Sequence, residues 1–203
     1  MFMAIYVLST GMSGALEQTV SVYPGPAESY RSKRYGAQVV QGKKVHAAFV
    51  MQSLNAWKEV PKKDGSNYEY TAMSKENHWL SFACQGAVQV LVSLLETKVK
   101  SVEILPQTPL AKARILEDGR VEVALEPDFV RANYYFLRIN GKEGDETPLF
   151  IFVDPPETEV SSPKDAKVRY FGPGVHDIGP HYEVQEGETV YLAGGALVRG
   201  TID

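Results

Sequence analysis

The stretch ARILEDGRVEVAL, residues 113–125, predicts a β-hairpin. Its second half alternates apolar with polar residues, which places Val121, Val123 and Leu125 on one face of a strand. An Asp-Gly pair at 118–119 separates the two halves, and this pair favours the tight turns that join antiparallel strands. The stretch therefore predicts two short strands with one apolar face.

Short apolar runs separated by turn residues continue from Thr19 to Asp154. In Val88–Val92 the three valines fall on one face, and Gln85-Gly86 and Asn140-Gly141 are further turn candidates. The predicted strands are Thr19–Tyr23, Ala37–Val40, Lys44–Met51, Tyr68–Met73, His78–Cys84, Ala87–Leu95, Val99–Leu105, Ala113–Leu116, Arg120–Leu125, Tyr134–Ile139 and Leu149–Val153. Met51–Lys58 is the best helix candidate, and it is short. Many short strands at regular intervals predict an all-β chain built around an antiparallel β-sandwich.

Composition excludes several classes of protein. The chain has 203 residues, of which 44% are hydrophobic and 23% charged, as in ordinary globular domains. The net charge of −4 argues against nucleic acid as the main partner. The chain has one cysteine, Cys84, so a disulfide scaffold is excluded, and we expect Cys84 to be a small core residue.

The N-terminal residues 1–18 begin with the apolar run MFMAIYVL and include Ser13-Gly14-Ala15, small residues like those before a signal-peptidase cut. Three interpretations are open: a clipped export signal, a mis-assigned start codon or a first strand. The first gives an expected location outside the cytoplasm, secreted or periplasmic. No stretch of the sequence is long and apolar enough to span a bilayer, so no membrane partner is expected.

The pattern of apolar runs changes near Asp154-Pro155-Pro156, which divides the chain into two parts. Residues 156–166 contain prolines, serines and charges without periodicity, which is typical of a linker. We therefore expect a β-sandwich domain over residues 19–155 and a second unit over residues 167–203. In that unit, very short apolar runs alternate with glycine turns, such as Gly172-Pro173-Gly174 and Gly194-Gly195. This pattern suits a solenoid in which coils of parallel β-strands stack.

Two segments of the second unit carry a family resemblance. YFGPGVHDIG, residues 170–179, and ETVYLAGGALVRGTI, residues 188–202, resemble the entry into the right-handed parallel β-helix of polysaccharide-cleaving glycoside hydrolases. The polygalacturonase-like and dextranase-like enzymes of the pectin-lyase-like group are the nearest. Many of these enzymes carry a β-sandwich first, which ends in a segment similar to PLFIFVDPP, residues 148–156. The resemblance implies a polysaccharide or oligosaccharide substrate and leaves its identity open.

The catalytic segments of that family have no match in this sequence. Polygalacturonase-type catalysis uses Asn-Thr-Asp, Asp-Asp, Gly-His-Gly and Arg-Ile-Lys segments, and Arg138-Ile139-Asn140 is only a partial match within the predicted sandwich. The family places its catalytic carboxylates several coils further on. We therefore carry over no catalytic residue, and we expect the chain to be the non-catalytic N-terminal part of a longer enzyme, without glycosidase activity by itself. The alternative is a complete small protein.

The ionisable residues support this assignment. Glycoside hydrolysis needs two carboxylates, and the local candidates Asp177, Glu183, Glu186 and Glu188 are better explained as loop-shaping or solvated residues. The histidines at 46, 78, 176 and 181 lack metal-ligand spacing, so no metal site is expected. Phosphate-loop and dinucleotide-binding fingerprints are missing from the sequence, so no cofactor is expected.

Aromatic residues are the candidates for contact with sugars. Trp57 lies beside charged residues near a loop and is our candidate for a glycan contact, whereas Trp79 is expected in the core. In Tyr134-Tyr135-Phe136 at least one ring must face outward if the segment is a strand. These residues do not by themselves predict a sugar-binding platform.

Three functions therefore compete: the N-terminal part of a glycoside hydrolase, a carbohydrate-binding or structural β-sandwich module, and an inactive structural piece. In the first, the aliphatic residues of the opening coil would have too few neighbours. These residues are Val190, Leu192, Leu197 and Ile202. We expect local instability there, or edge-to-edge self-association through the exposed strand.

Overall fold

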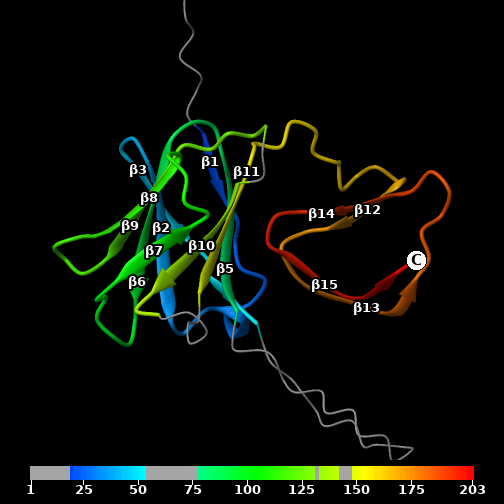
Figure 1. Cartoon of the computed structure of the whole chain (residues 1–203). Coiled ribbons are helices and arrows are strands. Elements are labelled where there is room, and N and C mark those ends of the chain that lie inside the picture. Colours follow the sequence, from blue (N-terminus) through cyan, green and yellow to red (C-terminus); the bar gives the residue numbers. More distant parts are fainter. Residues whose placement is uncertain (1–18, 54–76, 131–132, 142–147) are drawn as a thin grey trace, which may run out of the picture.

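The computed structural model describes residues 19–53, 77–130, 133–141 and 148–203. Within these ranges the regular structure is β-strand, apart from one short 3-10 helix, η1 (Glu28–Tyr30). The all-β prediction is therefore confirmed. Figure 1 shows two sheets lying face to face, with four further strands to one side of them.

The first sheet has the strand order β1-β5-β11-β10-β7, and β4 also pairs with β5. Its strands are β1 (Val20–Val22), β4 (Met51–Gln52), β5 (His78–Cys84), β7 (Val102–Leu105), β10 (Asn133–Ile139) and β11 (Leu149–Asp154). The second sheet has the order β3-β2-β6-β9-β8. Its strands are β2 (Tyr35–Gln41), β3 (Lys44–Ala48), β6 (Val88–Leu94), β8 (Ala111–Ile115) and β9 (Val121–Leu125).

The two sheets enclose one apolar core. Alternate residues of each strand point into it, so Val90 and Val123 of the second sheet meet the layer that holds Leu80 and Ile151 of the first. All four side chains are completely buried. Burying one such aliphatic side chain stabilises a fold by about 1.5–3 kcal/mol. Cys84 belongs to the same core, as expected from the sequence.

The hairpin that the sequence predicted joins β8 to β9. Gly119 has a φ of +84°, and its amide donates to the Leu116 carbonyl oxygen at 3.0 Å. The Asp118 carboxylate accepts from the Arg120 amide at 3.0 Å, which holds the turn from its own side chains. The local sequence determines this hairpin, because every residue that shapes the turn lies within a few positions of it.

Three sequence predictions need correction or fall outside the described residues. The first sheet is mixed, because β5 and β11 pair in parallel. Between those two strands the chain crosses to the second sheet twice, in β6 and in β8–β9, and then enters β11 from its antiparallel neighbour β10. Met51 and Gln52 form strand β4 where a helix was predicted, since they pair with Trp79 and His78. The predicted strand Tyr68–Met73 lies outside the described residues.

The last four strands form two parallel pairs. They are β12 (Val168–Phe171), β13 (Gly174–Tyr182), β14 (Thr189–Leu192) and β15 (Ala196–Ile202). Val168 pairs with Thr189 and Gly174 with Ala196, so partners lie 21 and 22 positions apart in the sequence. The chain therefore passes twice through the same two-strand path, the second pass lying beside the first (Figure 1).

A turn of this parallel-stranded region lies against the residues that directly follow β1. A Cβ on Gly194 would overlap the ring of Tyr23, and a Cβ on Gly195 would overlap the carbonyl oxygen of Pro24. Gly195 also has a φ of +90°, which L side chains rarely adopt. Both glycines of the Gly194-Gly195 turn are therefore needed for the close approach of the two regions.

Candidate functional site

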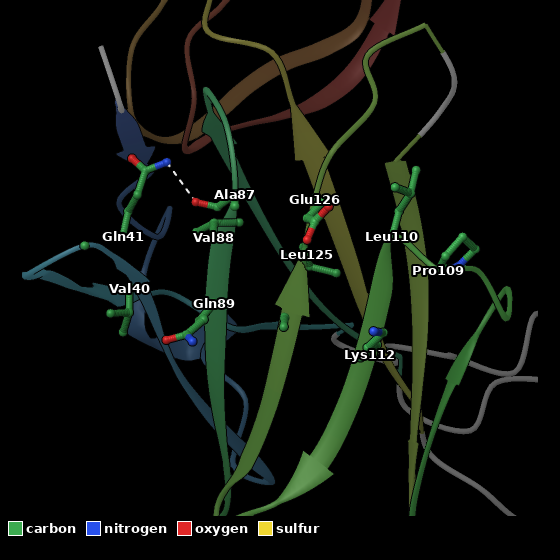
Figure 2. Close-up of a pocket in the computed structure, with 12 residues that line it drawn as sticks. Val40, Gln41, Ala87, Val88, Gln89, Pro109, Leu110, Lys112, Leu125 and Glu126 are labelled. Carbon is green, nitrogen blue, oxygen red and sulfur yellow. Dashed lines mark hydrogen bonds between the residues drawn. The ribbon is translucent and has the colours of Figure 1, made fainter. Parts of the chain in front are cut away.

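A groove of about 410 Å³ lies at one end of the second sheet (Figure 2). Strands β2, β6, β8 and β9 contribute to it, together with the loop that precedes β8. The polar groups that line it are Gln41, Gln89, Lys112 and Glu126. Its apolar lining includes Val40, Pro109 and Leu110.

Gln41 is a buried polar residue beside the groove, and its side chain lies on the core-facing side of β2, like that of Val39. It ends β2 and is 6% exposed, although it is polar. Its Nε2 donates to the carbonyl oxygen of Gln85 at 2.7 Å and to that of Ala87 at 3.1 Å. Buried polar side chains are retained when such hydrogen bonds offset their desolvation. The amide of Gln41 therefore ties the end of β2 to the turn that leads into β6 (Figure 2).

Strand register places the other polar side chains of the groove. Gln89 of β6 pairs with Ala124 of β9, and Ala124 pairs with Lys112 of β8. Gln89 and Lys112 are exposed, and the small Ala124 stands between them. Neighbouring strands lie about 4.8 Å apart, so the backbone positions of Gln89 and Lys112, two strands apart, are separated by roughly 10 Å. The small Ala124 side chain therefore leaves a depression on the sheet surface between the longer side chains of Gln89 and Lys112.

Glu126 and Leu110 are held together at the rim of the groove. The Glu126 amide donates to the Leu110 carbonyl oxygen at 2.8 Å, which continues the β8–β9 pairing beyond the ends of both strands. This bond fixes the backbone from which the Glu126 carboxylate and the apolar Leu110 side chain project. The groove is thus bounded by hydrogen-bonded backbone at its β2–β6 end and at its β8–β9 end.

The carboxylates weighed in the sequence lie in the parallel-stranded region. Asp177 lies on β13, where a loop-shaping role was expected, and accepts from Arg199 of β15 at 2.6 Å. This ion pair is exposed and joins adjacent strands of one parallel pair. Glu188 accepts from the Tyr182 hydroxyl at 2.6 Å, which lowers the pKa of Glu188. Within the described residues, Glu183 and Glu186 form no hydrogen bond with Tyr182 or Arg199, the partners of Glu188 and Asp177.

A hydrogen bond ties the parallel strands to the segment after β11. The Tyr191 hydroxyl donates to the Glu157 carboxylate at 2.6 Å, and this bond raises the pKa of Tyr191 to about 12. The Tyr191 ring also stacks on Tyr170, with 5.2 Å between centroids. Desolvation and the nearby Asp154 raise the pKa of Tyr23, which lies in the same neighbourhood. These groups form the polar side of the contact between the two regions.

A buried serine–histidine pair was not found from the sequence. Ser32 Oγ lies 2.9 Å from His78 Nδ1, and Ser32 also accepts from the amide of Tyr35 at 2.8 Å. Ser32 is 3% exposed and His78 is completely buried. A nucleophile needs access to its substrate, so we assign this pair a structural role, holding the segment before β2 on strand β5. The 46-residue separation hid it from local pattern analysis.

The outer face of the first sheet carries a row of aromatic side chains. Phe136 pairs with Phe150 and Phe150 with Trp79, across the adjacent strands β10, β11 and β5. In the next row Tyr134 packs edge-on against Phe152, with 5.3 Å between centroids. Tyr134 is exposed and the other rings are partly buried. The prediction that Tyr134-Tyr135-Phe136 turns one ring outward is confirmed.

The placement of Trp79 in the core was wrong. His78, Leu80 and Phe82 take the inward positions of β5, so Trp79 lies on the opposite, outer face and outside the core. The prediction relied on the alternation of Trp79 with Ser81, but these residues are two positions apart and share the outward face of β5. Trp57, our candidate for a glycan contact, lies outside the described residues, so its surroundings are not defined.

Cys84 has no reactive surroundings. It is completely buried, and burial raises the pKa of its thiol to about 11, so the thiol stays protonated at neutral pH. Across the described ranges, no group of three or more histidine, cysteine, aspartate or glutamate residues is arranged to hold a metal ion. The same ranges contain no helix long and apolar enough to cross a membrane.

Comparison with known proteins adds no assignment: no protein-family model and no curated protein matches the chain. The functional reading therefore depends on the geometry described above and on the sequence resemblance.

Proposed function

We propose that this chain is the N-terminal, non-catalytic part of a secreted or periplasmic glycoside hydrolase that cleaves a polysaccharide. In this proposal the two sheets form the β-sandwich domain, and β12–β15 form the first two coils of a right-handed parallel β-helix. The observation that carries the proposal is the parallel pairing of β12 with β14 and of β13 with β15, at a nearly constant offset of 20 to 22 positions. A solenoid coil repeats its strands in this way.

The stacking of side chains supports the same reading. Tyr170 of the first pass stacks on Tyr191 of the second with an angle of 18° between the rings. Phe171 pairs with Leu192 in the adjacent row. Like residues stacked at equivalent positions of successive coils are what a β-helix requires, because each coil buries its apolar side chains against its neighbours.

The two passes are unequally covered. Phe171 of the first pass is 3% exposed, whereas its partner Leu192 in the second is 48% exposed. Ile202, which pairs with Tyr182, is likewise exposed. A further coil stacked on β14 and β15 would bury both aliphatic side chains and satisfy the free strand edges. We therefore propose that the reaction takes place on coils that follow this segment in the whole enzyme.

The carboxylates of the parallel-stranded region fit a structural role in this proposal. A glycosidase needs one carboxyl group as acid and a second as base or nucleophile, on either side of the scissile bond. Asp177 is paired with Arg199, and Glu188 is hydrogen-bonded to Tyr182 and to the amide of Gln185. These bonds join the strands and turns of the two passes, which is a use different from proton transfer to a substrate.

The test compares two proteins from the same gene. Residues 1–203 and the longest chain that the gene encodes are purified, and the release of reducing sugars is measured on pectic, dextran-type and galactan polymers. We expect hydrolysis by the longer chain alone. A gene that encodes nothing beyond Asp203, or a longer chain without turnover on these polymers, would contradict the proposal. Turnover by residues 1–203 that disappears in Asp177→Ala would contradict the non-catalytic role.

A second candidate function is a carbohydrate-binding module without catalysis. The observation that favours it is the aromatic row of the first sheet, since sugar rings stack on exposed aromatic faces. Phe150 and Phe152 lie parallel to each other along β11, but each packs edge-on against a ring of β10, as in Phe136 and Phe150 at 5.2 Å, and these cross-strand pairs present less flat surface than a sugar platform needs. The activity assay above separates the two functions, because a binding module releases no reducing sugar from any polymer.

A further inference from the structure

The outer faces of the two sheets differ in polarity. Cross-strand pairing in the first sheet aligns one wholly apolar row on its outer face, made of Met51, Trp79, Phe150, Phe136 and Leu105. The matching row of the second sheet is Ala47, Gln38, Leu91, Glu122 and Arg114, and its last two members form an ion pair at 2.8 Å. A sheet face in contact with water is usually polar, so the apolar row indicates that a partner covers the first sheet.

A second row widens this outer apolar face. Ser81, Phe152 and Tyr134 pair across β5, β11 and β10, and neither row contains a charged residue. The face is covered unevenly. Ala83, which shares the outer side of β5 and pairs with Asp154, is 2% exposed, whereas Tyr134 is 56% exposed. Cover therefore exists only at the end of the face where the chain leaves β11.

The two passes of the parallel strands differ in their contact with the two-sheet region. In the second pass, Gly194-Gly195 lies against Tyr23-Pro24, directly after the edge strand β1. The equivalent turn of the first pass lacks such a contact within the described residues. A Cβ on Gly174 would meet nothing within 4 Å, and one on Gly172 would meet only the ring of Tyr170. The first pass therefore lies beyond the β1 edge of the sheet, and the second pass reaches that edge.

We propose that the outer apolar face of the first sheet is the docking surface for the next passes of the same parallel-stranded solenoid. This inference rests on the proposed function, which supplies those passes. Stacked passes and neighbouring strands share a spacing of about 4.8 Å. A third pass, stacked on the second and away from the first, therefore lies over β5, and later passes lie over β11 and β10. Figure 1 shows β5 and β11 on the side of the two sheets that faces the parallel strands.

The size of the face favours a partner in the same chain. Five strands span about 20 Å, and each is about 20 Å long, so the face offers roughly 400 Å². A stable complex of separate proteins buries about 800 Å² on each partner. A tethered partner needs less area, because the chain keeps it at a high effective concentration. The face carries no charge in its two rows, so we expect aliphatic and uncharged side chains at the turns that dock on it.

Thiol labelling tests whether the face is covered. Ser81→Cys and Tyr134→Cys each place a thiol in the second row, and Ser93→Cys places a matched thiol on the outer face of β6. The native Cys84 is buried and its thiol stays protonated, so it reacts slowly. Each variant is made in residues 1–203 and in the longest chain that the gene encodes. The rate of reaction with a maleimide is measured under native conditions, and mass spectrometry locates the label.

The expected result is a difference between the faces that appears only in the longer chain. Labelling of Ser81→Cys and Tyr134→Cys should be at least about tenfold slower there than in residues 1–203, whereas Ser93→Cys should react equally in both. Equal rates for the first two variants in the two chains, or equal slowing of Ser93→Cys, would overturn the proposal. Slow labelling of residues 1–203 that accelerates on dilution would also overturn it, because a second copy would then cover the face.

None of the three substitutions removes a side chain from the core between the sheets. The melting temperature of each variant is recorded, and agreement between Ser81→Cys and Tyr134→Cys guards against a local disturbance at one of them. Ser→Cys changes little in size, so Ser81→Cys carries the test if Tyr134→Cys melts early.

Failure of this inference can be told apart from failure of the proposed function. Hydrolysis by the longer chain, together with equal labelling of the face in both chains, contradicts the docking alone. Protection of the face in a longer chain that hydrolyses no polymer contradicts the enzyme and leaves the docking surface. A gene that encodes nothing beyond Asp203 contradicts both, because no further pass exists to dock.

Discussion

The two-sheet region and the parallel-stranded region differ in how much of their apolar surface is buried. In the first, side chains such as Val90 and Ile151 are completely buried between two sheets, whereas among residues 155–203 only Phe171 is buried. Both regions contain hydrogen-bonded strand pairs, but only the first packs a six-stranded and a five-stranded sheet around a cluster of buried apolar residues, whereas the second has two sheets of two strands each. Because a sheet is stabilised mainly by burying its apolar face, equal pairing does not give equal stability. The parallel-stranded region also packs against Tyr23 and Pro24 at its Gly194-Gly195 turn.

The largest expected difference concerns hydrogen exchange. Amides in Val88–Val92 should exchange only on global unfolding, whereas those in Tyr191–Val198 should exchange through local opening, at least about 100-fold faster. Exchange is measured by mass spectrometry on a protein shown by light scattering to be monomeric. Equal protection of the two segments would mean that the parallel strands are stabilised as well as the core.

Core truncation should separate the regions next. Phe82 is completely buried in the core, so Phe82→Ala should lower the free energy of unfolding by about 3–5 kcal/mol. Leu192 is 48% exposed, so Leu192→Ala should cost only about 0.5 kcal/mol. Urea denaturation followed by tryptophan fluorescence gives both values. Similar losses for the two variants would refute the difference in packing.

A double-mutant cycle tests the contact between the regions. Gly194→Ala places a methyl group in the Tyr23 ring and should loosen the parallel strands, whereas adding Tyr23→Ala should relieve the overlap. A coupling of about 0.5–3 kcal/mol is expected for residues in contact. Proteolysis of the segment between β11 and β12 provides the measurement.

Gly187→Ala is the control for that cycle. Gly187 has a φ of +79° and nothing within 4 Å of its Cβ position, so alanine there causes backbone strain without a clash. Tyr23→Ala should not rescue it. Rescue of both glycine variants alike, or of neither, would show that Tyr23 does not hold the turn.

The smallest expected effect is a change in tyrosine titration. Glu157 raises the pKa of Tyr191 to about 12, so Glu157→Gln should move that pKa toward the ordinary value of about 10. Because the folded-state pKa is the higher one, this contact stabilises the protein below about pH 10 and is lost as the pH rises toward 12. Ultraviolet difference titration of the two proteins measures the shift. An unchanged titration would place Tyr191 away from Glu157 in solution.

What the sequence could predict follows from the distance between interacting residues. The β8–β9 hairpin was predicted because Asp118, Gly119 and the alternation around them are contiguous. The parallel pairing of β5 with β11 joins residues 71 positions apart, such as Leu149 and His78, and no local pattern specifies that choice. Strand content was therefore predictable, whereas the mixed sheet was not.

The groove was missed for the same reason. Gln41 looks like an ordinary exposed strand residue in the sequence, and its role depends on carbonyl groups 44 and 46 positions away. Trp79 was misplaced because a buried, hydrogen-bonded histidine at 78 takes the inward position that an apolar residue usually occupies. In both cases a polar residue is buried by partners that only the tertiary structure supplies.

The contact of Gly194-Gly195 with Tyr23-Pro24 has a consequence for synthesis on the ribosome. Tyr23 emerges about 170 residues before the turn that covers it. At roughly 5–20 residues per second, the interval between them lasts about 10–30 seconds. During that time the N-terminal segment is made but its partner is not, so an aromatic ring and the neighbouring strand edge stay open to other nascent chains. Slow translation of the codons between Pro24 and Gly194 lengthens this interval and should therefore increase aggregation.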